Sequence, residues 1–486
     1  MSKLKRIHIY VLALTACLIS PQLMQAQIDN NYVPFHAADG LLPKSLYDFN
    51  LEGIVQQIKG GDQLEAEKLK RLATDIYYFK KEYAEGGNFY LKNELTDYVQ
   101  SIGDEILVSI PANKNNFKFY LSRSMEVNAF CMADGTVIIN LGLIASLDNE
   151  SQLAFIMAHE ISHYLKQHSV NDLKRTADVV TYDNVNQNSN RAVFRRLQFS
   201  RDSEFDADGF AINLLATTNF DAMECITALE KLKVSDTLVD SDPQQVLLNK
   251  YFKSEYCDFD TSWTSEKAIA AIHDRAAVTS ESNLMTQDFG DLLSTHPEIE
   301  KRQYALKEIM SNFDYSDIEK VEKFERKDFQ YIQRIARFEM VENSMRESYY
   351  THALYNAVRL LEYYPDNIYL NTTLSKSLYW ISYYKEINSG KLVVRQPVTT
   401  NDKAFFRIKA IIEKLDVTAA KKLSYGNAKI LSEALSSNEV SLFYMALNTE
   451  HYLGKNASFT YYNKYLKTYP EGRFVEFVNN RLSYMQ

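Results

Sequence analysis

The stretch Ala158-His159-Glu160-Ile161-Ser162-His163-Tyr164 carries the strongest signal for fold and chemistry in this sequence. On a helix, residues four positions apart share a face, so His159 and His163 can present two imidazoles to one metal ion. Glu160 lies one step round the helix, where its carboxylate can reach a water molecule beside the metal without being a ligand itself. This arrangement is the one that zinc-assisted peptide hydrolysis requires.

A helix is the structure that the flanking residues predict for this motif. Neither proline nor glycine interrupts the segment, and apolar side chains recur at a mostly helical spacing. The apolar positions are Leu153, Phe155, Ile156, Met157, Ile161 and Leu165. The motif is therefore expected on a helix that the core of the protein surrounds.

A catalytic zinc site needs a third protein ligand, and an acidic segment further along the chain supplies the candidate. Glu204 and Asp208 are four residues apart, so a helix would place both on one face. We predict Glu204 as the third ligand and Asp208 as the acceptor of the free N–H of a ligating histidine. Taken alone, the acidic residues between Asp202 and Asp208 would rather predict a solvated helix start. The metal interpretation depends on the H-E-x-x-H motif.

Together these motifs resemble the zinc metalloprotease family that includes the CaaX prenyl proteases, HtpX and BepA. The family pattern is H-E-x-x-H followed by E-x-x-x-D on a later helix. Two further segments match it in order, and the resemblance covers residues 65–310. They are Val127-Asn128-Ala129-Phe130 with Gly135-Thr136-Val137-Ile138-Ile139-Asn140-Leu141-Gly142-Leu143, similar to the family's N-A-F turn, strand and G-L stretch, and Ser294-Thr295-His296-Pro297 with Arg302, similar to its S-T-H-P…R segment.

The fold expected is α+β with two domains, of which the resemblance implies the first. We expect a zincin-like metalloprotease domain over residues 63–312, in which a small sheet lies over two metal-bearing helices. An N-terminal extension over 27–62 precedes it, and an all-α tetratricopeptide-like domain over 313–486 follows it.

Apolar spacing predicts the elements inside the first domain. Strands are expected over residues 116–121 and 136–140, and helices over 91–110 and 221–233. Residues 234–290 are predicted to be irregular and to shield the site.

A strand just before the active-site helix can offer its edge to a peptide, which suits a protease of broad sequence preference. With the resemblance, this predicts Asn128, Gly135 and Val137 as substrate-binding residues; the alternative is merely an edge strand of a small sheet. One departure from the family is Met132-Ala133-Asp134-Gly135, where relatives usually carry Pro-Gly-Gly. The departure touches no proposed ligand.

His296 is the late residue with a predicted catalytic role. The proline that follows it holds the backbone of His296 extended and so fixes the direction of its side chain. An imidazole near the zinc would stabilise the oxyanion of the tetrahedral intermediate. The alternative is a histidine on a surface loop. His168, by contrast, is predicted to be a surface histidine and no ligand.

Residues 1–26 are predicted to be an export signal, with a basic start and a largely apolar run over 7–19. One interpretation is simple cleavage after Ala26. The other is a lipoprotein signal, because Leu14-Thr15-Ala16-Cys17 fits a lipobox and would make Cys17 the lipidated first residue. A retained anchor is a third option, although the run is short for a spanning helix. Export to the periplasm or cell envelope is expected, as an outer-membrane lipoprotein in the second case.

Composition bounds the class of protein and its partners. The 486 residues are 46% hydrophobic and 24% charged, which is typical of a globular chain of two or three domains. The net charge of −9 and the absence of a dense basic run after the first residues argue against nucleic acid as a partner. Three cysteines beyond Cys17 (Cys131, Cys225 and Cys257) are an odd, sparse set that does not make a disulfide framework, although one pair is possible.

The C-terminal third shows helical periodicity without a catalytic motif. Apolar and aromatic stripes lead into Pro365-Asp366-Asn367 and again into Pro470-Glu471-Gly472. The two prolines are about three periods of ~34 residues apart, which is typical of tetratricopeptide helix pairs that bind partner segments in a groove. The alternative is an irregular helical domain that packs on the protease. Residues 391–402 are predicted to interrupt the array.

The function expected from these observations is that of an exported zinc metalloendopeptidase, with one Zn²⁺ per chain, that cleaves proteins or peptides in envelope protein quality control. An alternative from another class is an envelope assembly factor or chaperone, in which the helical domain binds client proteins and proteolysis is secondary. An inactive scaffold is disfavoured because every expected ligand position is present.

Overall fold

The computed structural model describes residues 30–35, 74, 77–132, 134–168, 201–232, 245–253, 255–282, 299–311, 328–387 and 402–485. Two compact units divide the chain. The sheet unit contains residues 35–235 and 280–339. The helical unit contains residues 236–279 and 340–486 together with the residues before 35.

The sheet unit is built on four short strands in the order β1-β2-β4-β3. They are β1 (Phe89–Tyr90), β2 (Lys118–Ser122), β3 (Ala129–Cys131) and β4 (Thr136–Asn140). β2 runs parallel to β4, with Lys118 opposite Thr136, whereas β1 and β3 pair antiparallel with β2 and β4. The strand predicted over 136–140 is confirmed residue for residue, and that over 116–121 is shifted by one or two residues.

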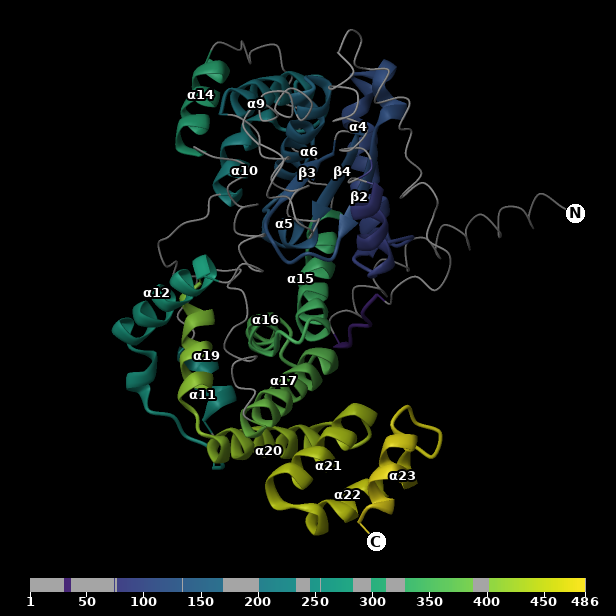
Figure 1. The fold of residues 1–486 in the computed structure, drawn as a ribbon, viewed down its shortest axis with the longest axis vertical. Helices are drawn as coiled ribbons and strands as arrows, with labels where there is room; N and C mark the ends of the chain where they lie inside the picture. Colours follow the sequence, from purple (N-terminus) through teal and green to yellow (C-terminus); the bar gives the residue numbers. More distant parts are fainter. Residues whose placement is uncertain are drawn as a thin grey trace, which may run out of the picture. The chain divides into compact units, whose positions relative to one another are not determined.

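Helices α4 (Glu94–Val108) and α6 (Glu150–Leu165) pack on the sheet and on each other. α4 begins at a capping box, in which Asn93 accepts from the Thr96 amide and the Thr96 side chain reaches back to Asn93. Its buried stripe, which includes Leu95, Val99 and Ile102, is the one that the spacing predicts. α4 lies against β2, and α6 lies against β3 and β4, as Figure 1 shows.

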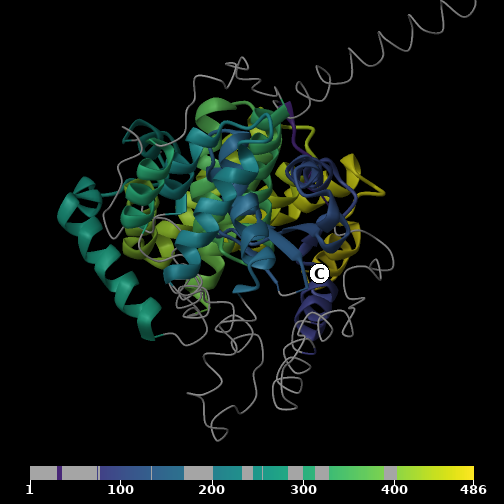
Figure 2. The same cartoon turned by 90° about the horizontal axis from the view of Figure 1, so that it is seen from above.

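α6 is the central helix of the sheet unit. Asn149 caps its first turn by accepting from the Gln152 amide, and thirteen residues of the helix are buried, from Glu150 through His163. Helix α9 (Arg201–Leu215) packs along α6, and α10 (Cys225–Leu232) and α14 (Ile299–Ser311) complete the shell. Figure 2 shows the cartoon of Figure 1 from above. Because α6 is enclosed, its polar residues need partners in the interior.

The prediction that residues 234–290 are irregular is wrong. They contain α11 (Gln245–Phe252), η5 (Thr261–Thr264) and α12 (Glu266–Ser282). Residues up to 279 group with the C-terminal helices, and Glu266 pairs with Lys403 and Arg407 on α19 (Lys403–Lys414). The shielding role stays a prediction. The domain limits 63–312 and 313–486 also stay predictions. Residues 236–279 belong to the compact unit that contains the C-terminal helices.

The helical unit stacks consecutive helices, from green to yellow in Figure 1. After α15 (Asp328–Arg346), α16 (Tyr350–Tyr363) packs on α17 (Ile368–Glu386), α17 on α20 (Val417–Ala434), α20 on α21 (Glu439–Leu453) and α21 on α22 (Lys455–Thr468). α23 (Val475–Ser483) closes the series on α22. The expected all-α character is confirmed for the described residues; the tetratricopeptide assignment stays a prediction, and the predicted insert at 391–402 lies almost wholly outside them.

Two further observations complete the description. No helix in the described parts of the chain combines the length and the apolar composition that crossing a lipid bilayer requires. Cys131, Cys225 and Cys257 are buried and free. The predicted export signal, with Cys17 and Ala26, lies outside the described residues.

Candidate metal centre

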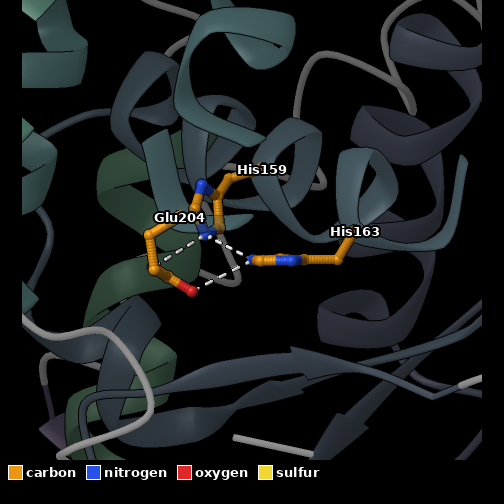
Figure 3. Close-up of side chains that lie close together, drawn as sticks. All are labelled: His159, His163 and Glu204. Atoms are coloured by element: carbon orange, nitrogen blue, oxygen red, sulfur yellow. Dashed lines mark hydrogen bonds and ion pairs between the residues drawn. The ribbon is translucent and has the colours of Figure 1, made fainter. Parts of the chain in front are cut away.

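α6 places the two predicted histidine ligands side by side, one helical turn apart. The Nε2 atoms of His159 and His163 lie 2.9 Å apart, and both side chains are buried. Figure 3 shows the two rings meeting at these nitrogens. The helical spacing therefore produces the juxtaposition that the sequence predicts.

Glu204, on α9, closes the third side of this group. Its Oε1 lies 3.3 Å from His163 Nε2, and its Oε2 lies 3.5 Å from His159 Nε2, as Figure 3 shows. One donor atom from each of the three residues falls within 4.8 Å of the others. Two ligands held tetrahedrally at 2.0–2.1 Å from zinc lie about 3.3 Å apart. The nitrogen–oxygen distances fit that value, and two imidazoles with one carboxylate form a donor set that zinc accepts.

Asp208 and Arg302 hold this group from behind. Asp208 Oδ1 lies 2.8 Å from His159 Nδ1, the ring nitrogen that faces away from His163. Arg302, on α14, donates two hydrogen bonds of 2.6 and 2.7 Å to Asp208, and its Nη1 lies 2.7 Å from Glu204 Oε2. All four side chains are at most 2% exposed. Asp208 therefore occupies the predicted position, and Arg302 orients both carboxylates of α9.

The electrostatics follow from this burial. Burial raises the pKa of Asp208, but the charge and hydrogen bonds of Arg302 outweigh it and hold that pKa below its ordinary value. Burial also lowers the pKa of His159, but hydrogen bonds to Asp208 and Glu204 raise it to about 9. Asp208 is thus ionised, and His159 stands in a negative field that attracts a cation.

Glu160 follows His159 on α6 and is fully buried. After burial, the charge of Glu160 is the next cause that raises the pKa of the Cys131 thiol on β3. The same carboxylate contributes to the raised pKa of Arg302, where the carboxylates together outweigh burial. Glu160 therefore lies within electrostatic reach of both β3 and the ligand-orienting arginine.

The prediction of a surface location for His168 is wrong. This residue is buried just beyond α6, and its Nδ1 lies 2.9 Å from Nδ1 of His163. Its Nε2 lies 3.2 Å from Oδ2 of Asp206 on α9. The sequence contains a weak signal for this contact, since His168 follows His163 by little more than one helical turn, but the chain must turn after α6 for the rings to meet.

In the described sheet β3 is an edge strand, whereas β4 is paired on both sides. Asn140 donates to the carbonyl of Asn128, and Met132 donates to the carbonyl of Thr136. Hydrogen-bonded and non-bonded pairs alternate along an antiparallel ladder. Ala129 and Cys131 therefore direct their backbone N–H and C=O groups away from β4. β3 is buried along its whole length, so a peptide must displace whatever covers it.

The three predicted substrate-binding residues lie near this edge, but their backbones serve the sheet. Gly135 adopts φ +79° in the turn before β4, and an added Cβ would lie 2.1 Å from the carbonyl oxygen of Asn116. Val137 lies inside β4, and the carbonyl of Asn128 is engaged by Asn140. Their substrate-binding roles stay predictions.

The departure from the family turn has a structural explanation. Asp134 forms a 2.7 Å ion pair with Lys80, and its other oxygen accepts from the Thr136 amide at the start of β4. Lys80 is buried and also bonds the Thr136 hydroxyl. Asp134 therefore ties the turn to the helical segment 77–85. The predicted oxyanion residue His296 lies outside the described residues.

Such an arrangement, in which paired histidines and a carboxylate from a second helix meet beside a sheet edge, is that of a metallopeptidase domain. The family model of peptidase family M48 matches residues 93–310, and this part of the chain is similar to that family.

Several relatives carry protease names. The beta-barrel assembly-enhancing protease of Escherichia coli (strain K12) is 30% identical over 174 residues, which are 32% of this chain and 36% of that protein. The protein of that name from Yersinia pestis is 27% identical over 185 residues (34% and 38%), and the mitochondrial metalloendopeptidase OMA1 of Arabidopsis thaliana is 31% identical over 114 residues (22% and 24%). The alignments thus span little more than a third of these relatives at most.

Proposed function

We propose that the sheet unit is a zinc-dependent endopeptidase. The observation that supports this most directly is the convergence of His159, His163 and Glu204, whose donor atoms lie within 4.8 Å of one another in the interior. These three residues would hold the zinc ion, and Asp208 would fix the tautomer of His159. When bound, zinc lowers the pKa of a water molecule and polarises a carbonyl group.

The chain's own residues supply the remaining chemistry. Glu160 accepts the proton of the attacking water and returns it to the leaving amine, as a general base and then a general acid. The outward backbone groups of Ala129 and Cys131 bind the substrate as an added strand, which tolerates many side chains. His296 is proposed as the group that stabilises the oxyanion.

The proposed biological role is protein quality control in the cell envelope. The relatives named for β-barrel assembly and the predicted export signal support it, and both interpretations of that signal, cleavage after Ala26 or lipidation of Cys17, agree with it. The helical unit is proposed as a tetratricopeptide-like surface for protein clients. An assembly factor in which proteolysis is secondary is less favoured, because the named relatives are proteases and the metal donors all converge.

Glu160→Gln tests the proposal. This variant keeps the shape of the side chain and all three metal donors, so we expect one zinc ion per chain and a loss of at least about 10²–10⁴-fold in hydrolysis of an unfolded protein such as casein. Glu308→Gln, which alters an exposed carboxylate on α14, is the matched control and should retain wild-type turnover. Unchanged hydrolysis by the Glu160→Gln protein would contradict the proposal.

A further inference from the structure

The contact between His163 and His168 restricts where both rings carry their protons. Two Nδ1 atoms lie 2.9 Å apart, so one must donate a proton and the other must accept it. A metal ligand needs a lone pair on the nitrogen that faces the ion, and for His163 that nitrogen is Nε2. The single proton of a neutral His163 ring therefore sits on Nδ1.

The remaining contacts agree with this assignment. His168 must then accept at Nδ1 and carry its own proton on Nε2. That nitrogen lies 3.2 Å from an oxygen of Asp206, which can accept the proton in a hydrogen bond. The other oxygen of Asp206 accepts from Lys166, 3.0 Å away. One set of tautomers thus satisfies the chain from His163 to the surface.

We propose that His168 is a positioning residue for the metal, which accepts the Nδ1 proton of His163 and so keeps Nε2 of that ring turned to the ion. The inference rests on the proposed function, because it assumes that His163 ligates zinc. It assigns to His163 a neutral partner in the place where His159 has the carboxylate of Asp208.

The charges of the site explain why the two ligands differ. Among the described residues, the carboxyl groups of Glu160, Glu204 and Asp208 lie in the interior, where Arg302 contacts two of them and a zinc ion would add two positive charges. A further buried carboxylate beside His163 would leave an uncompensated charge, which the interior disfavours strongly. The imidazole of His168 in that place accepts from His163 and donates to Asp206, whose side chain is 47% exposed.

Variants that keep or remove the acceptor test the inference. An asparagine side chain places its oxygen close to the position of Nδ1, whereas glutamine reaches the position of Nε2. We expect His168→Asn to keep zinc affinity within about threefold of wild type. His168→Gln and His168→Ala should lose about 10–100-fold, as other partners of ligating histidines do. Affinity is measured in the full-length chain by competition with a chelator.

Nitrogen-15 NMR of the zinc-loaded chain provides a readout that packing alone would not change. The proton of His163 should reside on Nδ1 and that of His168 on Nε2. Lys166→Ala, which removes the exposed partner of Asp206, is the control and should leave affinity and tautomers unchanged. Asp206→Ala, at a half-exposed position where folding is not at risk, should weaken zinc binding by a few-fold.

The outcomes separate this inference from the proposed function. If the wild-type chain binds no zinc, the proposed function fails. If the wild type binds zinc but the Asn and Gln variants bind it equally well or equally poorly, His168 only fills space and the inference is overturned. A proton found on Nδ1 of His168 in the loaded protein would overturn it as well.

Discussion

The candidate metal centre of the sheet unit and the C-terminal helices of the helical unit both set carboxylates against arginines, but at different depths. Glu204 and Asp208 are at most 2% exposed, and so is Arg302 between them. On α21, by contrast, Glu450 and Glu439 are 9% and 20% exposed. Their arginine partners, on α23 and just before it, are 43% and 61% exposed.

In the helical unit, tyrosine side chains connect the aromatic core to the partly exposed carboxylates. Tyr462 and Tyr465 are fully buried in its aromatic core, and their hydroxyls donate to Glu450 and Glu439 over 2.8 and 2.7 Å. Charges near solvent keep most of their hydration and contribute little on their own. Charges in the interior are tolerated only when each has a partner, so their arrangement is expected to serve binding and chemistry more than stability.

The largest effect on stability is expected from Arg302→Gln. The variant removes the guanidinium that contacts both Asp208 and Glu204 in the interior. We expect the metal-free protein to lose about 3–5 kcal/mol of stability, and zinc to restore part of it by binding the folded state. Calorimetry of the full-length chain with and without zinc measures both.

Arg275→Gln on α12 is the matched control for this comparison. Arg275 is 68% exposed and pairs with Glu413, so the loss should not exceed about 1 kcal/mol. If the two substitutions destabilise the protein equally, burial does not determine how much these ion pairs contribute to stability.

A smaller effect, dependent on pH, is expected from Glu126→Gln. Among the residues that the structure describes, Glu126 has no cationic partner, and burial raises its pKa from 4.5 to about 8. The folded protein retains a proton that the unfolded chain releases, so this stabilisation is complete below 4.5 and disappears as pH rises through about 8. Glutamine stays neutral and should remove that slope.

The difference in unfolding free energy between the two ends of this pH range measures the effect of Glu126. We expect roughly 2–3 kcal/mol, less than the full shift of pKa implies, because the side chain keeps partial contact with water. An identical pH profile in the wild type and the glutamine variant would show that Glu126 is ionised and solvated in the folded state.

The smallest effect is expected from Tyr462→Phe. The variant keeps the buried ring and removes the hydroxyl that bonds Glu450, while Arg481 still pairs with that carboxylate. We expect a loss of about 1 kcal/mol. Hydrogen exchange of the α22 amides measures this loss locally. A local measurement is needed because a chain of two compact units need not unfold in one two-state step. A loss as large as that of Arg302→Gln would abolish the contrast between the units.

Local periodicity explains the elements that the sequence predicts well. The spacing of His159 and His163, and of Glu204 and Asp208, specifies helix faces without reference to the rest of the chain. The β-branched run over 136–140 specifies β4 in the same way. The helices between residues 245 and 282 escaped prediction because their support is distant: Glu266, for example, pairs with Lys403 and Arg407.

The amino-acid order alone was enough to identify the two histidines, the adjacent glutamate and the later carboxylate as one chemical group, since each pair repeats at the period of a helix. It was not enough to reveal that His168 folds back on His163, that Arg302 joins Glu204 to Asp208, or that β3 forms the edge. Those features arise when elements far apart in the chain pack together, and the desolvation of their charges then selects the partners.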